Sequence, residues 1–375
     1  MTRALLALLL VLSQFSVDAA PRRRAALHPV PVVAPEAIVA AARQAAEKAL
    51  AAGVPAMQIA VSHHGRVIYS EAFGVTDKQS ATAATPKSVL RVGSITKQFT
   101  AAAILRLAER GELTLDDRIE KYVPDFDTRG RTITLRHLLT HTSGVARDPY
   151  PAILTPATVM APFPRAQALK TLNTKPFDFT PGAKWSYSNS GYLLLGYAIE
   201  SITGMPYAEF IHNELALPLG LLDTGVCGTS NLPLHDGYSF IQGQWTRLDS
   251  FHTSGMISSG ALCSTASDLT RWAHLLATGR AMLPESYATM TTAARLANNT
   301  VVPNNYALGV GVQKMFGHPA VSHGGAVPGF LSFLLYLSDQ EIGVSVISNA
   351  FPFPADGNSE LIANALAKVA LDALE

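Results

Sequence analysis

A serine and a lysine stand three residues apart in the stretch Ser94-Ile95-Thr96-Lys97. Apolar side chains recur at helical spacing over residues 98–110, which predicts a helix directly behind this stretch. Residues i and i+3 share a helix face, so we expect the Ser94 hydroxyl and the Lys97 amine to meet. A lysine in a dry pocket can activate a serine nucleophile, whereas the alternative is a simple helix cap beside a solvated lysine.

A second group of polar side chains, Tyr187-Ser188-Asn189, precedes a helix predicted over residues 190–203. A phenol beside the serine and lysine could shuttle a proton, and the Asn189 amide could hold Lys97 or a substrate carbonyl. Capping and core packing are the alternative roles for these residue types. Trp185 and Tyr150 could line the same cleft, although core packing is favoured for Trp185.

A third stretch, His323-Gly324-Gly325-Ala326, precedes an apolar strand predicted over residues 330–337. Glycines there would let a substrate lie against strand backbone, where an N–H group can point at an oxyanion. The alternative is a glycine-rich turn with an incidental histidine. Together these residues are candidate substrate-binding positions.

Periodicity predicts an α/β fold of the α+β kind, in which a mostly antiparallel sheet is flanked by N- and C-terminal helices. The sheet lobe would be discontinuous, from residues 35–110 and 301–375, and a mainly helical lobe would occupy residues 111–300. A cleft between two lobes is a usual place for a site. Helices are expected over residues 36–51, 98–110, 135–141, 190–203, 206–214, 265–279 and 359–374, and strands over 57–63, 66–72, 306–315, 330–337 and 342–348.

The N-terminus has the pattern of an export signal. Arg3 precedes an apolar run, and small residues offer cleavage near Ala19, so residues 1–19 are predicted as a signal peptide and 20–34 as a linker. The apolar run is too short for a comfortable membrane span. The mature chain is therefore expected in the periplasm or secreted.

Composition narrows the possible partners. The 375 residues carry a net charge of +1 without a basic stripe, so no nucleic-acid partner is expected. His137 and His141 stand four apart but lack the accompanying glutamate and a third ligand, so we expect no metal. The two cysteines, Cys227 and Cys263, are as compatible with one disulfide as with two buried thiols.

The three motifs, in this chain order, resemble those of the serine hydrolases of the class C β-lactamase and D-alanyl-D-alanine carboxypeptidase family. Residues 111–113, 137–144 and 260–272 also look like the family, and the resemblance covers residues 35–370. It implies a β-lactamase/transpeptidase-like fold and a reaction that needs no cofactor. It also implies that Ser94 is acylated, that Lys97 and Tyr187 exchange protons, that Asn189 orients, and that the Ser94 and Ala326 amides bind the oxyanion.

One departure bears on the substrate. The family's β-lactamases usually have Lys-Thr-Gly at the third motif, where this chain has His323-Gly324-Gly325. A neutral histidine and a glycine grip a carboxylate less well. An esterase or a peptidase of D-amino-acid substrates is therefore favoured over an efficient β-lactamase. A slowly turning over penicillin- or peptidoglycan-binding protein is the alternative, and the oligomeric state and the identity of the first base, Lys97 or Tyr187, stay open.

Overall fold

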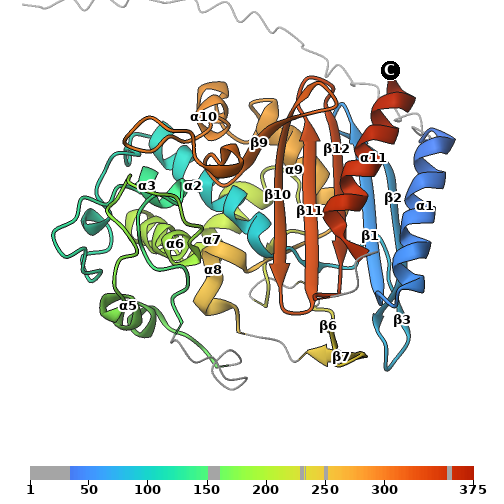
Figure 1. The fold of residues 1–375 in the computed structure, drawn as a ribbon, viewed down its shortest axis with the longest axis horizontal. Coiled ribbons are helices and arrows are strands. Elements are labelled where there is room, and N and C mark those ends of the chain that lie inside the picture. Colours follow the sequence, from blue (N-terminus) through green and yellow to red (C-terminus); the bar gives the residue numbers. More distant parts are fainter. Residues whose placement is uncertain (1–33, 151–160, 229–231, 233, 249–251, 353–356) are drawn as a thin grey trace, which may run out of the picture. The chain divides into compact units, whose positions relative to one another are not determined.

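An antiparallel sheet of seven strands lies between two layers of helices (Figure 1). The computed structural model describes residues 34–150, 161–228, 232, 234–248, 252–352 and 357–375. The expected signal peptide, and all but the last residue of the expected linker, lie outside these described residues. Residues 33–375 cluster as one compact unit, and the boundaries expected for two lobes stay a prediction.

The sheet joins the two ends of the chain. Its order is β3-β2-β1-β12-β11-β10-β9, and every neighbouring pair is antiparallel. In β1 and β12, Ile59 pairs with Val346, a residue 287 positions further along the chain. The expectation of a mostly antiparallel sheet is confirmed. The strands are β1 (Ala56–His63), β2 (Arg66–Asp77), β3 (Thr82–Ala83), β9 (Gly311–Met315), β10 (His318–Val327), β11 (Phe330–Leu337) and β12 (Ile342–Ser348).

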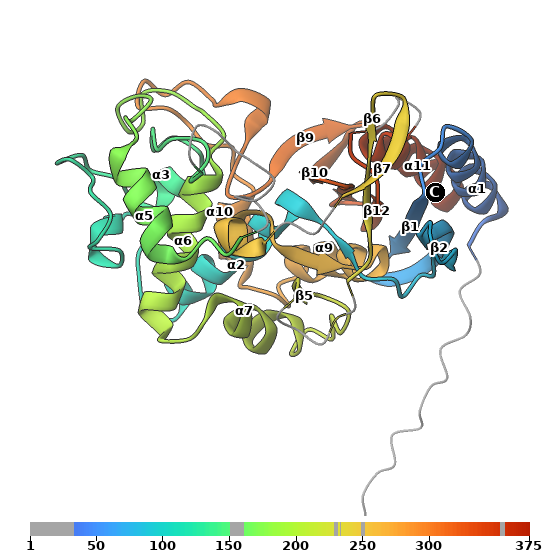
Figure 2. The ribbon, with the colours of Figure 1, turned by 90° about the horizontal axis from the view of Figure 1, so that it is seen from below.

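Alternating side chains of these strands bury both faces of the sheet. In β1, Met57, Ile59 and Val61 belong to the cluster beneath the terminal helices α1 (Glu36–Ala51) and α11 (Ser359–Leu374). The opposite face packs against α9 (Ala266–Ala277). Figure 2 shows the sheet between α9 and the pair formed by α1 and α11. The two terminal helices were expected with these bounds, because their apolar residues recur at helical spacing.

The remaining helices include α2 (Thr96–Glu109), which is buried along most of its length and packs against several of the others. Apolar side chains contact it on all sides, as a fully enclosed helix requires. A short 3-10 turn, η1 (Gly93–Ile95), leads into it. The others are α3 (Leu135–Leu139), α5 (Arg165–Thr174), α6 (Asn189–Thr203), α7 (Tyr207–Phe210), α8 (Ile257–Gly260), α10 (Pro284–Met290), a π-helical stretch η3 (Ile211–Ala216), and the 3-10 turns η2 (Ile119–Lys121), η4 (Thr253–Met256) and η5 (Pro303–Asn305).

The described residues also form two small sheets besides the seven-stranded one. One contains β4 (Leu90–Arg91), β8 (Leu262–Ser264) and β5 (Gly225–Val226), and the other pairs β6 (Gly237–Ile241) with β7 (Gln244–Leu248). A disulfide joins Cys227 to Cys263, which decides the question that the sequence left open. Since β8 pairs with β4, the disulfide braces the segment that leads into η1.

The strand β10 was missed by the sequence analysis, and the strand expected over 306–315 begins only at Gly311. Pro319 and two glycines disguise β10, because both residue types are unfavourable inside strands. Pairing with β9 on one side and β11 on the other holds it extended nonetheless. No helix among the described residues combines the length and apolarity needed to cross a membrane.

Candidate active site

The predicted nucleophile Ser94 lies half-buried in η1, at the entrance to α2. Gly93 before it has φ of +50°, a left-handed conformation that favours glycine. The Thr96 hydroxyl donates to the Gly93 carbonyl at 2.7 Å and accepts from the Leu262 amide at 3.0 Å. This turn is therefore anchored to the small sheet behind it.

The Lys97 amine reaches Ser94, as the spacing predicted. Its Nζ atom lies 3.3 Å from the Ser94 Oγ, and it donates to the Asn189 Oδ1 at 2.8 Å and to the Ser259 carbonyl at 2.7 Å. Lys97 is completely buried. Burial sets its pKa well below the ordinary value, against a smaller opposing effect of the Asp148 carboxylate.

Tyr187 stands over the same pair. Its ring centroid lies 4.6 Å from the Lys97 Nζ. Burial raises the pKa of the Tyr187 phenol, and a hydrogen bond with Ser94 only partly offsets this. The same burial thus favours the neutral amine and the neutral phenol, because both charged forms lose hydration.

Asn189 is oriented by a residue that the sequence analysis did not single out. Its Nδ2 donates to the Asp148 Oδ1 at 2.7 Å, which turns its Oδ1 toward Lys97. Ser188 caps α6 by accepting from the Gly191 amide. Asp148 lies 41 residues before Asn189 in an irregular segment, so no periodic or spacing signal could have indicated it.

The expected stretch His323-Gly324-Gly325-Ala326 lies within β10, not in a turn ahead of the strand. A Cβ atom on Gly93 would lie 2.9 Å from the Ala326 amide nitrogen, so the backbones of η1 and β10 nearly touch. A Cβ atom on Gly325 would lie 2.0 Å from the Val92 carbonyl oxygen. Only glycines allow this approach, which brings the Ser94 segment beside Ala326.

A chain of hydrogen bonds connects β10 to the predicted cap of α6. The Ser188 amide donates to the His141 Nδ1 at 3.1 Å, so the His141 proton is on Nε2, which lies 3.2 Å from the Tyr306 hydroxyl. That hydroxyl can then donate to the His323 Nε2 at 3.1 Å, and the His323 Nδ1 donates to the Gly324 carbonyl. Each histidine is neutral in this arrangement.

The pKa values agree with that assignment. Burial lowers the pKa of His323 to about 4, with a smaller effect of the nearby Lys97, and burial also sets the pKa of His141 well below its ordinary value.

Tyr306 was expected only as the start of a strand. Nothing in its sequence surroundings distinguishes it from a core tyrosine.

An open cavity of about 450 Å³ extends from Tyr187 and His323. Trp185 lines it and is half-buried, so the cleft-lining role holds for Trp185, although core packing was favoured. Tyr150 is buried against Phe163 with ring centroids 5.0 Å apart, so the hydroxyl-bearing ring packs away from this cavity.

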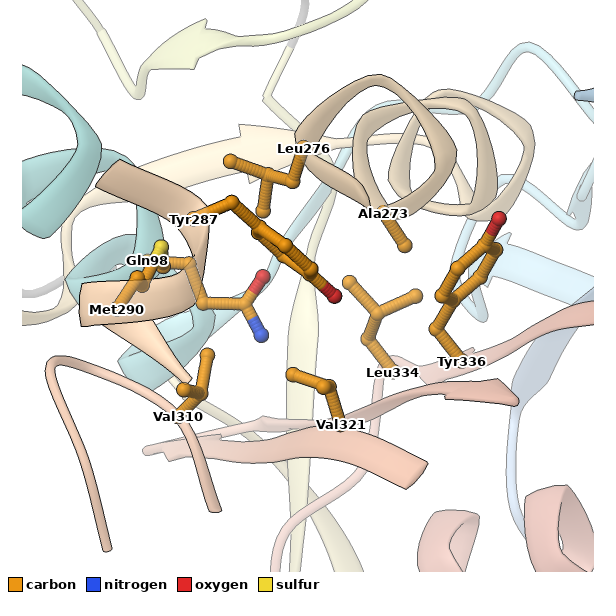
Figure 3. A pocket seen from close by; sticks show the side chains of 9 residues that line it. All are labelled: Gln98, Ala273, Leu276, Tyr287, Met290, Val310, Val321, Leu334 and Tyr336. Atoms are coloured by element: carbon orange, nitrogen blue, oxygen red, sulfur yellow. The ribbon is translucent and has the colours of Figure 1, made fainter. Parts of the chain in front are cut away.

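A second, enclosed cavity lies between α9, α10, α2 and the sheet (Figure 3). Its lining is mostly apolar, and the polar side-chain atoms drawn there belong to Gln98, Tyr287 and Tyr336. With about 10 Å³ of free space it accommodates at most one water molecule. Of these two cavities, the open one beside Tyr187 and His323 has the room for a substrate.

Comparison with known proteins identifies the family. The model of the family described as "Beta-lactamase" matches residues 42–368, most of the chain. The chain belongs to the beta-lactamase family. The beta-lactamase fold expected from the three motifs is confirmed by this match and by the arrangement of the sheet and helices.

Curated relatives of this beta-lactamase family member cover parts of it. Protein flp of Staphylococcus aureus (strain N315) is 29% identical over 307 residues, 79% of this chain and 60% of flp. The chain thus spans about three fifths of the length of the first such relatives. Esterase EstB of Burkholderia gladioli is 32% identical over 194 residues, 47% of this chain and 49% of EstB.

Solved structures of similar fold extend over nearly the whole chain. The penicillin-binding protein homologue from Pyrococcus abyssi has a TM-score of 0.75 at 26% identity, covering 89% of this chain and 77% of its own. The D-stereospecific amidohydrolase from Streptomyces sp. has a TM-score of 0.69 at 28% identity, covering 89% and 97%. These similarities agree with the beta-lactamase fold.

Proposed function

We propose that this protein is an exported serine hydrolase that forms an acyl-enzyme on Ser94 and acts on esters or D-amino-acid amides and peptides. The observation that carries the proposal is the fully buried Lys97 amine, 3.3 Å from the Ser94 Oγ. A buried amine that loses its proton near neutral pH is a suitable base for a serine hydroxyl.

The contacts of Lys97 support its role as the first base. A neutral amine has two N–H groups and one lone pair. The Asn189 Oδ1 and the Ser259 carbonyl accept the two N–H groups, so the lone pair is left for the Ser94 hydroxyl proton. Because burial raises the pKa of Tyr187, the phenol begins the reaction protonated and is suited to act afterwards as an acid.

Acylation would then proceed in three proton transfers. Ser94 attacks the substrate carbonyl while its proton passes to Lys97, and the backbone amides of Ser94 and Ala326 stabilise the oxyanion. Collapse of the tetrahedral intermediate expels the leaving group, which takes a proton from Tyr187, and Lys97 returns a proton to the phenolate. Water hydrolyses the acyl-enzyme by the same groups in reverse.

The third motif supports the substrate class. A cation would help hold a substrate carboxylate, yet burial keeps His323 neutral above pH of about 4, and its ring is engaged by Tyr306. Similarity to an esterase and to a D-stereospecific amidohydrolase agrees with esters and D-amino-acid amides as substrates. β-Lactams with a carboxylate are expected to react less efficiently.

Export is the part of this proposal that depends on the N-terminal signal pattern. The Cys227–Cys263 disulfide supports it, because such bonds persist in oxidising compartments. Mass spectrometry of the protein from the periplasm and medium would test it. We expect a chain that begins at Ala20, and a full-length chain found only inside the cell would contradict export.

The test of the reaction compares wild type with Ser94→Ala and Lys97→Ala on p-nitrophenyl esters and D-amino-acid amides. We expect each variant to lose at least about 1,000-fold in kcat/KM, the scale of removing an activated nucleophile or its base. A trapped acyl group should map to the Ser94 peptide. Near-normal hydrolysis by Ser94→Ala would refute the proposal, and Ser80→Ala, at an exposed serine of the β2–β3 turn, is the control.

A fluorescent penicillin distinguishes the slow-turnover alternative, which the similarity to a penicillin-binding protein homologue makes worth testing. Labelling of Ser94 that persists for hours, without turnover of any ester or amide, would favour that alternative over a hydrolase.

A further inference from the structure

The open cavity beyond Tyr187 has a distinctive charge. Its described lining includes the side-chain amides of Asn304, Asn305 and Gln313 but neither lysine nor arginine. Its one carboxylate belongs to Glu360, and the neighbouring His323 is neutral above pH of about 4. The described lining therefore carries a net negative charge at neutral pH.

Glu360 is held at this place by the start of α11. The Asn358 side chain caps the helix and accepts from the Glu360 amide at 2.9 Å. Ser359 and Ile362 on either side are buried against the sheet, whereas Glu360 is exposed. The backbone is thus fixed, and the carboxylate faces solvent at the cavity.

Another part of the cavity wall is also defined by backbone conformation. Asn304 and Asn305 have φ of +58° and +47°, two consecutive left-handed residues that are not glycine. They lead directly into Tyr306, whose hydroxyl bonds both His141 and His323. Their side chains consequently line a rim that is tied to β10.

The position of Tyr187 indicates which part of a substrate enters this cavity. Tyr187 lines it and, in the proposed reaction, protonates the leaving group. The departing portion of the substrate would therefore extend from Ser94 past Tyr187 toward Glu360. The acyl portion would lie on the other side of the scissile bond.

We propose that this cavity is a leaving-group subsite that selects esters and amides whose departing portion carries a positive charge, with Glu360 as the specificity-determining residue. The inference rests on the proposed function and deepens it. The Glu360 carboxylate attracts an ammonium group, and the amides of Asn304, Asn305 and Gln313 supply uncharged hydrogen bonds. A departing portion that carries a carboxylate is repelled, which disfavours peptides that end in a free D-amino acid.

Three esters of one acid test the proposal: the choline ester, the 3,3-dimethylbutyl ester of the same shape without charge, and the 3-hydroxypropanoate ester with a carboxylate. The ratio of kcat/KM for the choline and 3,3-dimethylbutyl esters is measured for wild type, Glu360→Gln and Glu360→Lys. Comparison between variants cancels the intrinsic reactivity of each ester.

We expect Glu360→Gln to lower the choline preference about two- to five-fold, the effect of one solvent-facing charge pair. Glu360→Lys should lower it further and raise the relative rate on the carboxylate ester. The neutral ester should react within about two-fold of wild type in both variants, and high salt should reduce the wild-type preference. Glu47→Gln removes an exposed carboxylate from α1 and should leave all ratios unchanged.

Failure of this inference is distinguishable from failure of the proposed function. Unchanged ratios in Glu360→Gln and Glu360→Lys, with hydrolysis still dependent on Ser94, overturn the subsite and leave the hydrolase standing. Hydrolysis that survives in Ser94→Ala overturns the proposed function itself.

Discussion

Single side chains at this site have their protonation set by burial more than by neighbouring charges. Lys97 is completely buried and its amine contacts three oxygen atoms, and His323 and His141 share one tyrosine hydroxyl. In each case loss of hydration disfavours the cationic form. The result is a cluster of neutral donors and acceptors with defined directions.

Tyr306 should matter as a positioning residue. Tyr306→Phe leaves the His141 Nε2–H and the His323 Nε2 without their partner, so we expect the free energy of unfolding to fall by about 1–3 kcal/mol. Because β10 then loses its link to the segment before α6, we expect kcat/KM for a neutral ester to fall about ten-fold, a loss of about 1.4 kcal/mol in transition-state binding.

The control for Tyr306→Phe is Tyr336→Phe. It removes another buried hydroxyl, on β11, which lies 3.2 Å from the ring of His274 on α9. It should lower stability without altering the kinetics. Equal kinetic losses in the two variants would contradict a positioning role for Tyr306.

Stability should depend on the protonation of His323. Its pKa is about 4 in the folded chain and near 6.5 when unfolded. Between these pH values the unfolded chain binds a proton that the folded chain does not, so the free energy of unfolding rises with pH. This contribution of His323 is lost as the pH falls toward 4. The contribution is about 3 kcal/mol.

Urea unfolding at pH values from about 7 to about 4 measures this effect, because this range spans the folded and unfolded pKa values of His323. In His323→Gln the loss of stability on acidification should be smaller by about that amount, while His141 continues to contribute in the same direction. An identical pH dependence in wild type and variant would show that His323 is not the responsible group.

At the scale of elements, the site depends on how closely β10 approaches the turn before α2. The Ser332 hydroxyl on β11 donates to the Val92 carbonyl at 2.9 Å, so the next strand also holds this turn. The candidate oxyanion-binding amides of Ser94 and Ala326 come from elements more than 200 residues apart in sequence. Their spacing is set by packing between η1 and β10.

Two adjacent glycines test this packing. In Gly325→Ala the new methyl group would meet the Val92 carbonyl at 2.0 Å and the Ser332 hydroxyl at 2.5 Å. We expect a cost in stability of about 1–3 kcal/mol. A shift of β10 should also lower kcat/KM by about 100-fold, as misplaced catalytic groups do.

Gly324→Ala is the matched variant, because its methyl group would lie 3.4 Å from the Phe333 ring, an ordinary contact. Its stability should stay near wild type, and its kcat/KM should fall much less than that of Gly325→Ala. If both variants behave alike, the close approach of β10 to η1 does not control the reaction.

For the whole molecule, the sheet assembles the two ends of the chain, and the disulfide joins two points in the middle of the chain, one of them in β8, which pairs with β4 ahead of Ser94. The bond between Cys227 and Cys263 spans 36 residues and fixes β5 next to β8. The chain can fold around its large core, so we expect this bond to add stability and not to determine the fold.

Replacing both cysteines by serine should lower the free energy of unfolding by about 3–4 kcal/mol, the chain-entropy value for a loop of this length. Urea unfolding of wild type, with and without a reductant, and of the double variant measures it. A reductant should have no effect on the double variant. Equal stability of oxidised and reduced wild type would contradict this role.

The local sequence determined the elements whose apolar pattern is regular and whose bonds are close in sequence. A period of 3.6 residues predicts the helices α1 and α11 and the contact between Ser94 and Lys97. A period of two predicts the strands β1, β11 and β12. The resemblance of three motifs to a known family indicated the beta-lactamase fold, and the family match confirms it.

Only the tertiary structure revealed the strand β10 and the disulfide. It also revealed the hydrogen-bond partners of the site residues, namely Asp148, Ser259 and Tyr306. Each depends on groups far apart in sequence, where spacing along the chain carries no information about distance in space. Pairing on both sides holds a strand that contains proline and glycine, and burial by distant elements sets the protonation of Lys97 and His323.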